Sequence, residues 1–242
     1  MFAVLTHKAG DHLVRQIIVS ILLKSNTVGD LKMKIWHNFR FRMHWPDNEN
    51  PKWWLDLFVV DSLFREILTN NREKIDLWRF HRRAARDNSG HQLTLLCYMT
   101  KENSKLINDV IQKSSTLRIL NGNGNLREFL YEEGGNNIEN SSDGNWPIEI
   151  QKSWPYFIDG VSEMLLEMID VIRTAVAEGL DLHPPLEDPN DIERLYIKVN
   201  ERLISLWQNE GSHAFFHHIN ALFGYAPLLA QPRNLAGILA SF

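Results

Sequence analysis

Residues 34–45 read KIWHNFRFRMHW, and the alternation of apolar and polar side chains in this stretch decides the fold. The apolar positions are Phe39, Phe41, Met43 and Trp45, and the polar positions between them are Arg40, Arg42 and His44. Successive side chains of a strand point to opposite faces of a sheet. The pattern therefore predicts a strand with one face in the core and one cationic face.

The residues that follow continue an α+β pattern. From residue 53 to residue 68, apolar side chains recur at the spacing of an amphipathic helix. Residues 75–85 and 91–100 flank the turn sequence RDNSG and predict a β-hairpin. A helix over residues 101–114 completes the order strand, helix, strand, strand, helix, which is most of a ferredoxin-like unit.

The rest of the chain is expected to be a loop followed by helices. Residues 121–147 are rich in Gly, Asn and Ser, which predicts a mobile loop. Apolar residues at helical spacing predict three helices, over residues 154–172, 192–206 and 212–223. We expect a basic α+β sheet module over residues 1–120 and an acidic helical part over residues 148–242 that packs on it, as one composite domain. The ambiguous pattern of residues 1–30 allows a further strand and helix.

The composition is that of a globular protein. The chain has 242 residues, of which 44% are apolar, enough to form a core without covalent crosslinks. Cys97 is the single cysteine, so the sequence provides neither a disulfide framework nor a four-cysteine zinc site. The apolar run from Ile17 to Leu23 is too short to cross a bilayer, and no secretory signal is recognisable. We expect a soluble cytoplasmic protein that does not contact a membrane.

Charge is divided unevenly along the chain. Residues 1–125 contain 19 Lys and Arg against 12 Asp and Glu, whereas residues 126–242 contain 7 against 18. Two explanations are open: the two halves attract each other, or the basic half meets an anionic partner. Because the formal net charge of the whole chain is −4, an extended groove for nucleic acid is not expected.

Cationic side chains gather on one predicted face of the sheet. These side chains are Arg40, Arg42 and His44 of the first strand, and Arg79, His81 and Arg83 of the second. Guanidinium groups bind carboxylates and phosphates through paired, planar hydrogen bonds, so such a face suits an acidic peptide, a glutamyl group or a nucleotide. The alternative is that these arginines pair with the acidic helices and cover the sheet with their aliphatic stems.

Histidines provide a second group of candidates. His213 and His217 are four residues apart, the spacing of helical metal sites, but the intervening residues and the absence of a third indicated ligand argue against a metal. No phosphate loop is recognisable, and no cofactor is expected. Because histidine titrates near neutral pH, His217 or His218 could transfer protons; the alternative for each is a structural role.

Two segments resemble the small elimination domain of lanthipeptide dehydratases, which also occurs as free-standing proteins of thiopeptide pathways. Residues 77–96, LWRFHRRAARDNSGHQLTLL, resemble that family's arginine-bearing strand, Asp-containing turn and returning strand. The residues in matching positions are Arg82 or Arg83, Asp87 and His91. Residues 217–224, HHINALFG, are similar to the family's late helix with its His-x-Asn-Arg-Leu-Phe-Gly motif, and His218 is in register.

The resemblance implies a lyase that acts on a ribosomally made precursor peptide and needs no cofactor. In that family a partner enzyme glutamylates a Ser or Thr side chain, and the small domain removes the glutamate by β-elimination. Elimination needs a base, an acid and cations that stabilise the developing negative charge. Taken with the cationic face, the resemblance implies His218 and Arg83 as catalytic residues. The implied substrate-binding residues are Arg40, Arg42, His44, Arg79, His81, Arg82 and His91.

The sequence also departs from the family pattern. Leu93 and Leu95 stand where the returning strand of the family carries arginines. Ala221 replaces the arginine of the late motif, and Phe216 replaces its earlier histidine. Two hypotheses remain open: an enzyme of the dehydratase-elimination type or a related cyclase, and a non-catalytic module that binds an anionic peptide or protein in a biosynthetic complex.

Overall fold

The computed structural model describes residues 33–183 and 185–222. The chain divides into two units, Met1–Lys34 and Ile35–Phe242, and the architecture below is that of the second unit. The strand and helix that the sequence allows within residues 1–30 lie outside the described residues.

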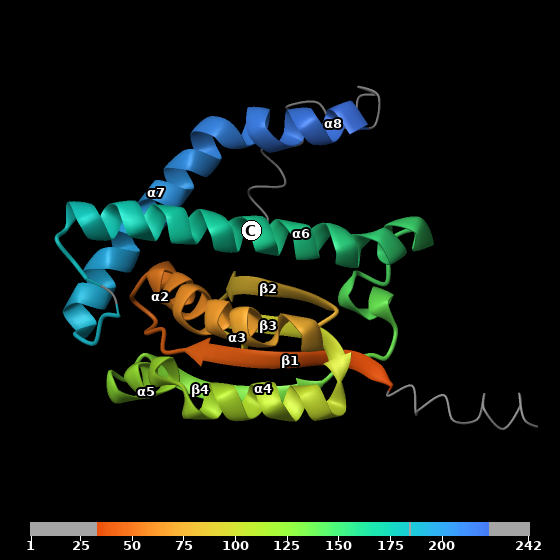
Figure 1. Ribbon diagram of the computed structural model, residues 1–242, viewed down its shortest axis with the longest axis horizontal. Coiled ribbons are helices and arrows are strands. Elements are labelled where there is room, and N and C mark those ends of the chain that lie inside the picture. The colour runs from red at the N-terminus through yellow and green to blue at the C-terminus, as the bar shows by residue number, and fades with distance from the viewer. Residues whose placement is uncertain (1–32, 184, 223–242) are drawn as a thin grey trace, which may run out of the picture. The chain divides into compact units, whose positions relative to one another are not determined.

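An antiparallel sheet of four strands organises this unit (Figure 1). The strands are β1 (Lys34–Met43), β2 (Leu77–Ala84), β3 (His91–Thr100) and β4 (Leu126–Glu133), in the spatial order β2-β3-β1-β4. Because β3 lies between β1 and β2, the helical connection from β1 to β2 forms a split βαβ unit. The predicted α+β fold with a ferredoxin-like sheet module is therefore confirmed.

Helices on one face of the sheet enclose the core. They are α2 (Trp53–Val59), the π-helical turn η1 (Val60–Phe64), α3 (Arg65–Asn71), α4 (Lys101–Lys113) and α5 (Ser115–Gly122), and the 3₁₀ turn η2 (Arg72–Lys74) leads into β2. Phe41 of β1 and Phe64 of η1 are fully buried, with ring centroids 5.8 Å apart. Burial of each such side chain contributes about 1.5–3 kcal/mol. The hydroxyl groups of Ser62 and Thr116, 3.0 Å apart, link η1 to α5 on this face.

Side-chain caps set the starts of α4 and α5. The Thr100 hydroxyl accepts a hydrogen bond from the Asn103 backbone N–H, and the Ser114 hydroxyl accepts one from the Leu117 N–H. Each cap satisfies one of the backbone donors that a helix leaves unpaired at its first turn. Ser114 therefore ends the predicted helix and begins α5, a short helix that the sequence pattern did not indicate.

The prediction of a loop over residues 121–147 is wrong at Leu126–Glu133, which form strand β4. Two aromatic side chains of β4 reach the core: Phe129 contacts Phe41 with ring centroids 5.0 Å apart, and Tyr131 stacks on Phe39 at 5.3 Å. Half of the residues in LREFLYEE are charged, which concealed the apolar alternation of a strand. Tertiary packing against β1, rather than local composition, therefore determines this strand.

The second half of the chain is helical, as predicted. It contains α6 (Ile148–Gly179), α7 (Pro189–Gly211), the π-helical turn η4 (Ser212–His217) and α8 (His218–Leu222), and a 3₁₀ turn, η3 (Ile138–Ser141), precedes it. Helix α6 lies along the β2 edge of the sheet (Figure 1). There the Trp78 backbone N–H donates to Asp159 and its indole N–H donates to Glu163, each at 2.7 Å. The bond to Asp159 occupies a backbone donor that an edge strand would otherwise expose.

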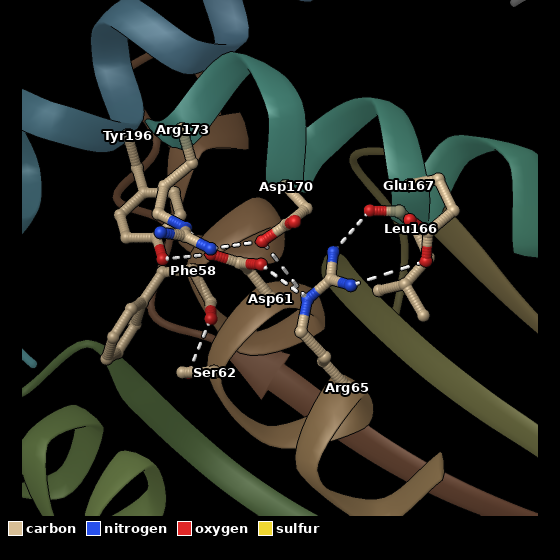
Figure 2. Close-up of polar contacts among 9 residues, drawn as sticks. All are labelled: Phe58, Asp61, Ser62, Arg65, Leu166, Glu167, Asp170, Arg173 and Tyr196. Atoms are coloured by element: carbon tan, nitrogen blue, oxygen red, sulfur yellow. Dashed lines mark hydrogen bonds and ion pairs between the residues drawn. The ribbon is translucent and has the colours of Figure 1, made fainter. Parts of the chain in front are cut away.

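One buried carboxylate joins η1 to α6 and α7 (Figure 2). Asp61 is 7% exposed, and its Oδ1 accepts a hydrogen bond from Arg65 Nε at 2.9 Å. Its Oδ2 accepts from Arg173 Nε of α6 at 2.9 Å and from the Tyr196 hydroxyl of α7 at 2.8 Å. Burial and the neighbouring Asp61 carboxylate raise the pKa of Tyr196. Because removing a carboxylate from water costs several kcal/mol, these donors are what allow Asp61 to be buried.

Replacing Asp61 should therefore destabilise the whole unit. We expect Asp61→Asn to lower the free energy of unfolding by about 3 kcal/mol, because Arg65 and Arg173 would lose their buried counter-charge and keep only the more exposed Glu167 and Asp170. Asp109→Asn removes an exposed carboxylate from α4 and should change stability by less than about 0.5 kcal/mol. Urea unfolding of both variants measures the difference, and equal stabilities would contradict the role assigned to Asp61.

Stability should also depend on pH through His37. This side chain is fully buried in β1, and its Nδ1 lies 2.9 Å from the Tyr131 hydroxyl. Burial lowers the pKa of His37 from its ordinary value of 6.5, so the unfolded chain takes up this proton at a higher pH than the folded chain. Stability is then full above pH 6.5 and falls as the pH drops toward the folded-state pKa.

Urea unfolding between neutral and mildly acidic pH tests this dependence. His37→Gln should reduce the slope of stability against pH, because the titrating group is removed. His183→Gln should leave the slope unchanged, since His183 is 90% exposed. An unchanged slope in His37→Gln would show that another group carries the dependence.

Candidate functional site

The sheet divides the predicted site residues between its two faces. Those on the outer face, opposite the core helices, are Arg40, Arg42, Arg79, His81 and Arg83. Arg82 and His91 lie on the core face. A sheet separates side chains on its opposite faces by its own thickness, so the structure does not bring all of these residues into one site; Arg42 and His91 meet only at the end of the sheet, in the lining of one pocket.

Most outer-face arginines are paired within the sheet itself. Arg40 lies 2.9 Å from Glu132 and Arg42 lies 3.0 Å from Glu128, both glutamates belonging to β4. Arg83 pairs with Asp87 in the turn between β2 and β3. The partners are thus neighbouring strand and turn residues rather than the acidic helices that the sequence analysis offered as an alternative. Hydrogen bonds from Arg83 and from the backbone of the turn lower the pKa of Asp87 to about 2.

One end of the outer face is covered by η3. Arg79 Nη2 donates to the Ser141 carbonyl at 3.0 Å, and Trp36 Nε1 donates to the Ile138 carbonyl at 2.9 Å. Burial lowers the pKa of Arg79. Desolvation, together with the positive charges of Arg79 and Arg83, also lowers the pKa of His81. This end of the face is therefore used for packing the segment between β4 and α6.

On the core face, Arg82 and His91 hold a buried carboxylate. Asp56 of α2 has no exposed surface, and it accepts hydrogen bonds from Arg82 Nε at 3.1 Å and His91 Nε2 at 3.0 Å. Arg82 Nη2 also donates to the Trp53 carbonyl at 2.8 Å, and its guanidinium lies over the Trp53 ring. Arg82 and His91 thus attach α2 to the β2–β3 hairpin, because both side chains bind the buried carboxylate of α2.

A pocket of about 500 Å³ opens where β1 ends, beside the β2–β3 turn and the start of β4. Its polar lining includes Arg42, His44, Asp47, Arg86, Asp87 and Arg127, and Trp45 supplies an aromatic wall. Gly90 closes the turn with a φ of +62°, a conformation that glycine adopts without strain. The volume lies within the range of ligand pockets, and the charged residues of the lining are three arginines and two aspartates.

Arg86 is a fixed wall of this pocket. Its guanidinium stacks on Trp45 at 3.4 Å from the ring centroid. Arg86 Nη2 donates to the carbonyl oxygens of Pro46, Asp47 and Glu49 at 2.9–3.1 Å. These contacts join the segment after β1 to the turn between β2 and β3, so both walls of the pocket hold a defined position.

Arg127 and His44 are the side chains of the pocket that remain available to an anionic ligand. Both side chains are exposed, and neither makes a hydrogen bond or an ion pair with any described residue. The register of β1 and β4 explains the position of Arg127: Arg42 pairs with Glu128 and Met43 with Leu126, so Arg127 is the extra residue of a β-bulge. Bulges redirect side chains at sheet edges, which is what happens here.

The candidate acid His218 lies at the start of α8. Its described ring contacts are with His213 and His217, at centroid distances of 5.9 and 5.1 Å. The described partner of Arg83 is Asp87. The structure therefore does not bring His218 and Arg83 together as a catalytic pair.

The division of charge along the chain is used in part within the protein. Arg65 of α3 lies 3.5 Å from Glu167 of α6, and Arg72 of η2 lies 3.3 Å from Glu163 of α6. These pairs are partly exposed, so each contributes about 1 kcal/mol or less. The basic and acidic halves thus attract each other along α6, through helix and turn arginines rather than through the predicted strand arginines.

Sequence reasoning identified Arg42, His44 and His91 but missed Arg86 and Arg127. Arg86 stands within the turn sequence RDNSG, and Arg127 within a segment that was interpreted as a loop. The aromatic residues Phe129 and Tyr131, two positions apart, were a usable strand signal. This signal could not have shown the bulge, which depends on pairing with β1.

Comparison with known proteins adds no family. We find no protein-family model that matches the chain, and neither a curated protein nor a solved structure that is similar to it. The resemblance to lanthipeptide dehydratases therefore stays a prediction. Among the described residues, no helix is both long and apolar enough to cross a membrane.

The turn beside the pocket provides a direct test of its electrostatics. Arg83→Gln should raise the pKa of Asp87 from about 2 toward the ordinary value of 3.8, because the largest stabilising hydrogen bonds come from the guanidinium. The backbone donors of Ser89 and Gly90 should keep the new value somewhat below 3.8. Arg118→Gln, in α5, is the control. NMR titration of the Asp87 carboxyl carbon measures the shift, and the same pKa in all three proteins would exclude this ion pair.

Proposed function

We propose that the protein binds an anionic peptide and holds a carboxylate of that peptide in the pocket beside Arg127 and His44. The observation that supports this function is that the exposed guanidinium of Arg127 and the exposed imidazole of His44 line a pocket of about 500 Å³ and make no ion pair with any described residue. A bound carboxylate would supply the counter-charge that no described residue provides.

The balance of charge in the pocket supports an anionic ligand. The acids in the lining are Asp47 and Asp87, and Asp87 is engaged by Arg83. Asp47 lies 3.6 Å from Arg86 with its side chain fully exposed. No described acid therefore balances the positive charge of Arg127. A hydrogen bond between this guanidinium and a ligand carboxylate would contribute about 1.5–3 kcal/mol.

A peptide is supported over a small inorganic anion by the shape and lining of the pocket. The ring of Trp45 offers an apolar surface for the aliphatic part of a side chain, while its face toward Arg86 is already occupied. A pocket of this volume accommodates more than a single acid group.

Glutamate β-elimination on a precursor peptide, supplied by a separate glutamylation enzyme, is the alternative that the family resemblance implies. That reaction requires an acid opposite the cations. The described contacts of His218 are with other histidines, so the geometry favours binding over elimination. Incubation with a glutamylated peptide and mass spectrometry distinguishes the two: loss of glutamate would establish the enzyme.

Binding can be measured with a fluorescent peptide that carries one Glu and a matched peptide that carries Gln. We expect the Glu peptide to bind more tightly, and Arg127→Ala to weaken its binding by about tenfold, since one charge-assisted hydrogen bond is lost. The matched control is Arg118→Ala, which removes an exposed arginine from α5, outside the pocket. Equal affinity for the two peptides, or no effect of Arg127→Ala, would contradict the proposal.

A further inference from the structure

The two edges of the sheet are not equivalent. The β2 edge is covered by α6, with Asp159 accepting the Trp78 N–H. In the part of the chain that the structure describes, β4 is the other edge strand and pairs with β1 alone. An edge strand presents a row of backbone donors and acceptors, and an extended peptide can pair with them.

The register shows which backbone groups of β4 point to the open side. The Gly134 N–H donates to the Trp36 carbonyl at 2.7 Å, so this pair is hydrogen-bonded. In antiparallel strands hydrogen-bonded pairs recur at every second residue. Leu130 and Glu132 therefore direct their backbone groups toward β1. Phe129 and Tyr131, which alternate with them, direct theirs away from β1.

The open edge strand β4 contributes one residue to the proposed pocket. Arg127, whose side chain lines the pocket, stands two residues before Phe129 on the same strand. A strand advances about 3.3 Å per residue, so a peptide paired with Phe129 and Tyr131 would reach Arg127 within about two or three residues.

The charges of β4 indicate what kind of peptide the edge accepts. Glu128 and Glu132 are paired with Arg42 and Arg40, and Glu133 lies 2.7 Å from Lys101. The glutamates of this strand are thus already neutralised, whereas Arg127 has no ion-pair partner within residues 33–183 and 185–222. A peptide that is uncharged along the edge and carries one acid at the end near Arg127 is complementary to this pattern.

From these observations we infer that the peptide binds by strand addition: it pairs with β4 as a fifth strand and places a Glu or Asp side chain on Arg127. The inference rests on the proposed function and specifies its binding mode. Backbone hydrogen bonds to Phe129 and Tyr131 provide affinity without side-chain selectivity, and the pocket selects the acid.

The test uses a probe peptide of alternating Thr and Val with a Glu at one end, together with a set of variants that each carry one N-methylated backbone amide. N-methylation removes one donor without changing the side chains. We expect affinity to fall by about tenfold at every second position and to change little at the positions between, because only alternate amides face β4.

Amide hydrogen exchange on the protein provides a second readout. Binding of the probe should slow exchange at Phe129 and Tyr131, and it should leave Trp78 and Phe80 of β2 unchanged as the internal control. Arg127→Ala should weaken binding of the probe and keep the alternation.

The possible failures separate the two proposals. If all N-methylated probes bind equally while the preference for Glu persists, strand addition is wrong and the carboxylate pocket stands. If the unmodified probe does not bind at all, both are wrong. Protection that appears at β2 instead of β4 would also overturn the inference.

Discussion

Asp61 is buried where the helices that cover the sheet meet α6 and α7, and its charge has to be balanced at that point. Arg65 and Arg173 balance it, and the Tyr196 hydroxyl donates a hydrogen bond to it. Helices α6 and α7 cannot move away without removing donors from a buried carboxylate, which is costly. This constraint holds α6 against the β2 side of the sheet, and the β4 side is left as the accessible edge.

The π-helical turn η1 is the local feature that makes this arrangement possible. It inserts a wider turn between α2 and α3, so that Asp61 reaches toward α6 and α7 while Leu63 and Phe64 remain in the core. Five residues earlier, Asp56 points to the β2–β3 hairpin and is held by Arg82. One helical segment thus directs two buried carboxylates to two different neighbours. Both carboxylates lie beside arginines. From the sequence alone, such arginines could be interpreted either as partners of these acids or as ligand-binding residues.

The number of arginines on a surface does not indicate how many can bind a ligand. Arg40, Arg42 and Arg83 are paired with acids on neighbouring strands and turns, and their charge is already used. Arg127 differs because the bulge in β4 takes it out of register with β1. A binding site for an anion therefore depends on which cation has no acidic partner in the folded protein. Among the described residues of the pocket this cation is Arg127, at the start of the edge strand β4.

The sequence by itself determined the strand KIWHNFRFRMHW, the later hairpin and the long helices. In each of these segments the apolar residues recur with the period of a strand or a helix, and this local pattern is sufficient to predict the element. It indicated His44 and Arg42 at the site, but not Arg127 or the strand that carries it. The tertiary structure decided β4, because the strand is stabilised by pairing with residues 86 to 92 positions away, at Arg42 and Arg40. It also decided which cations are neutralised, since charge pairing depends on distance in space and not on order in the chain.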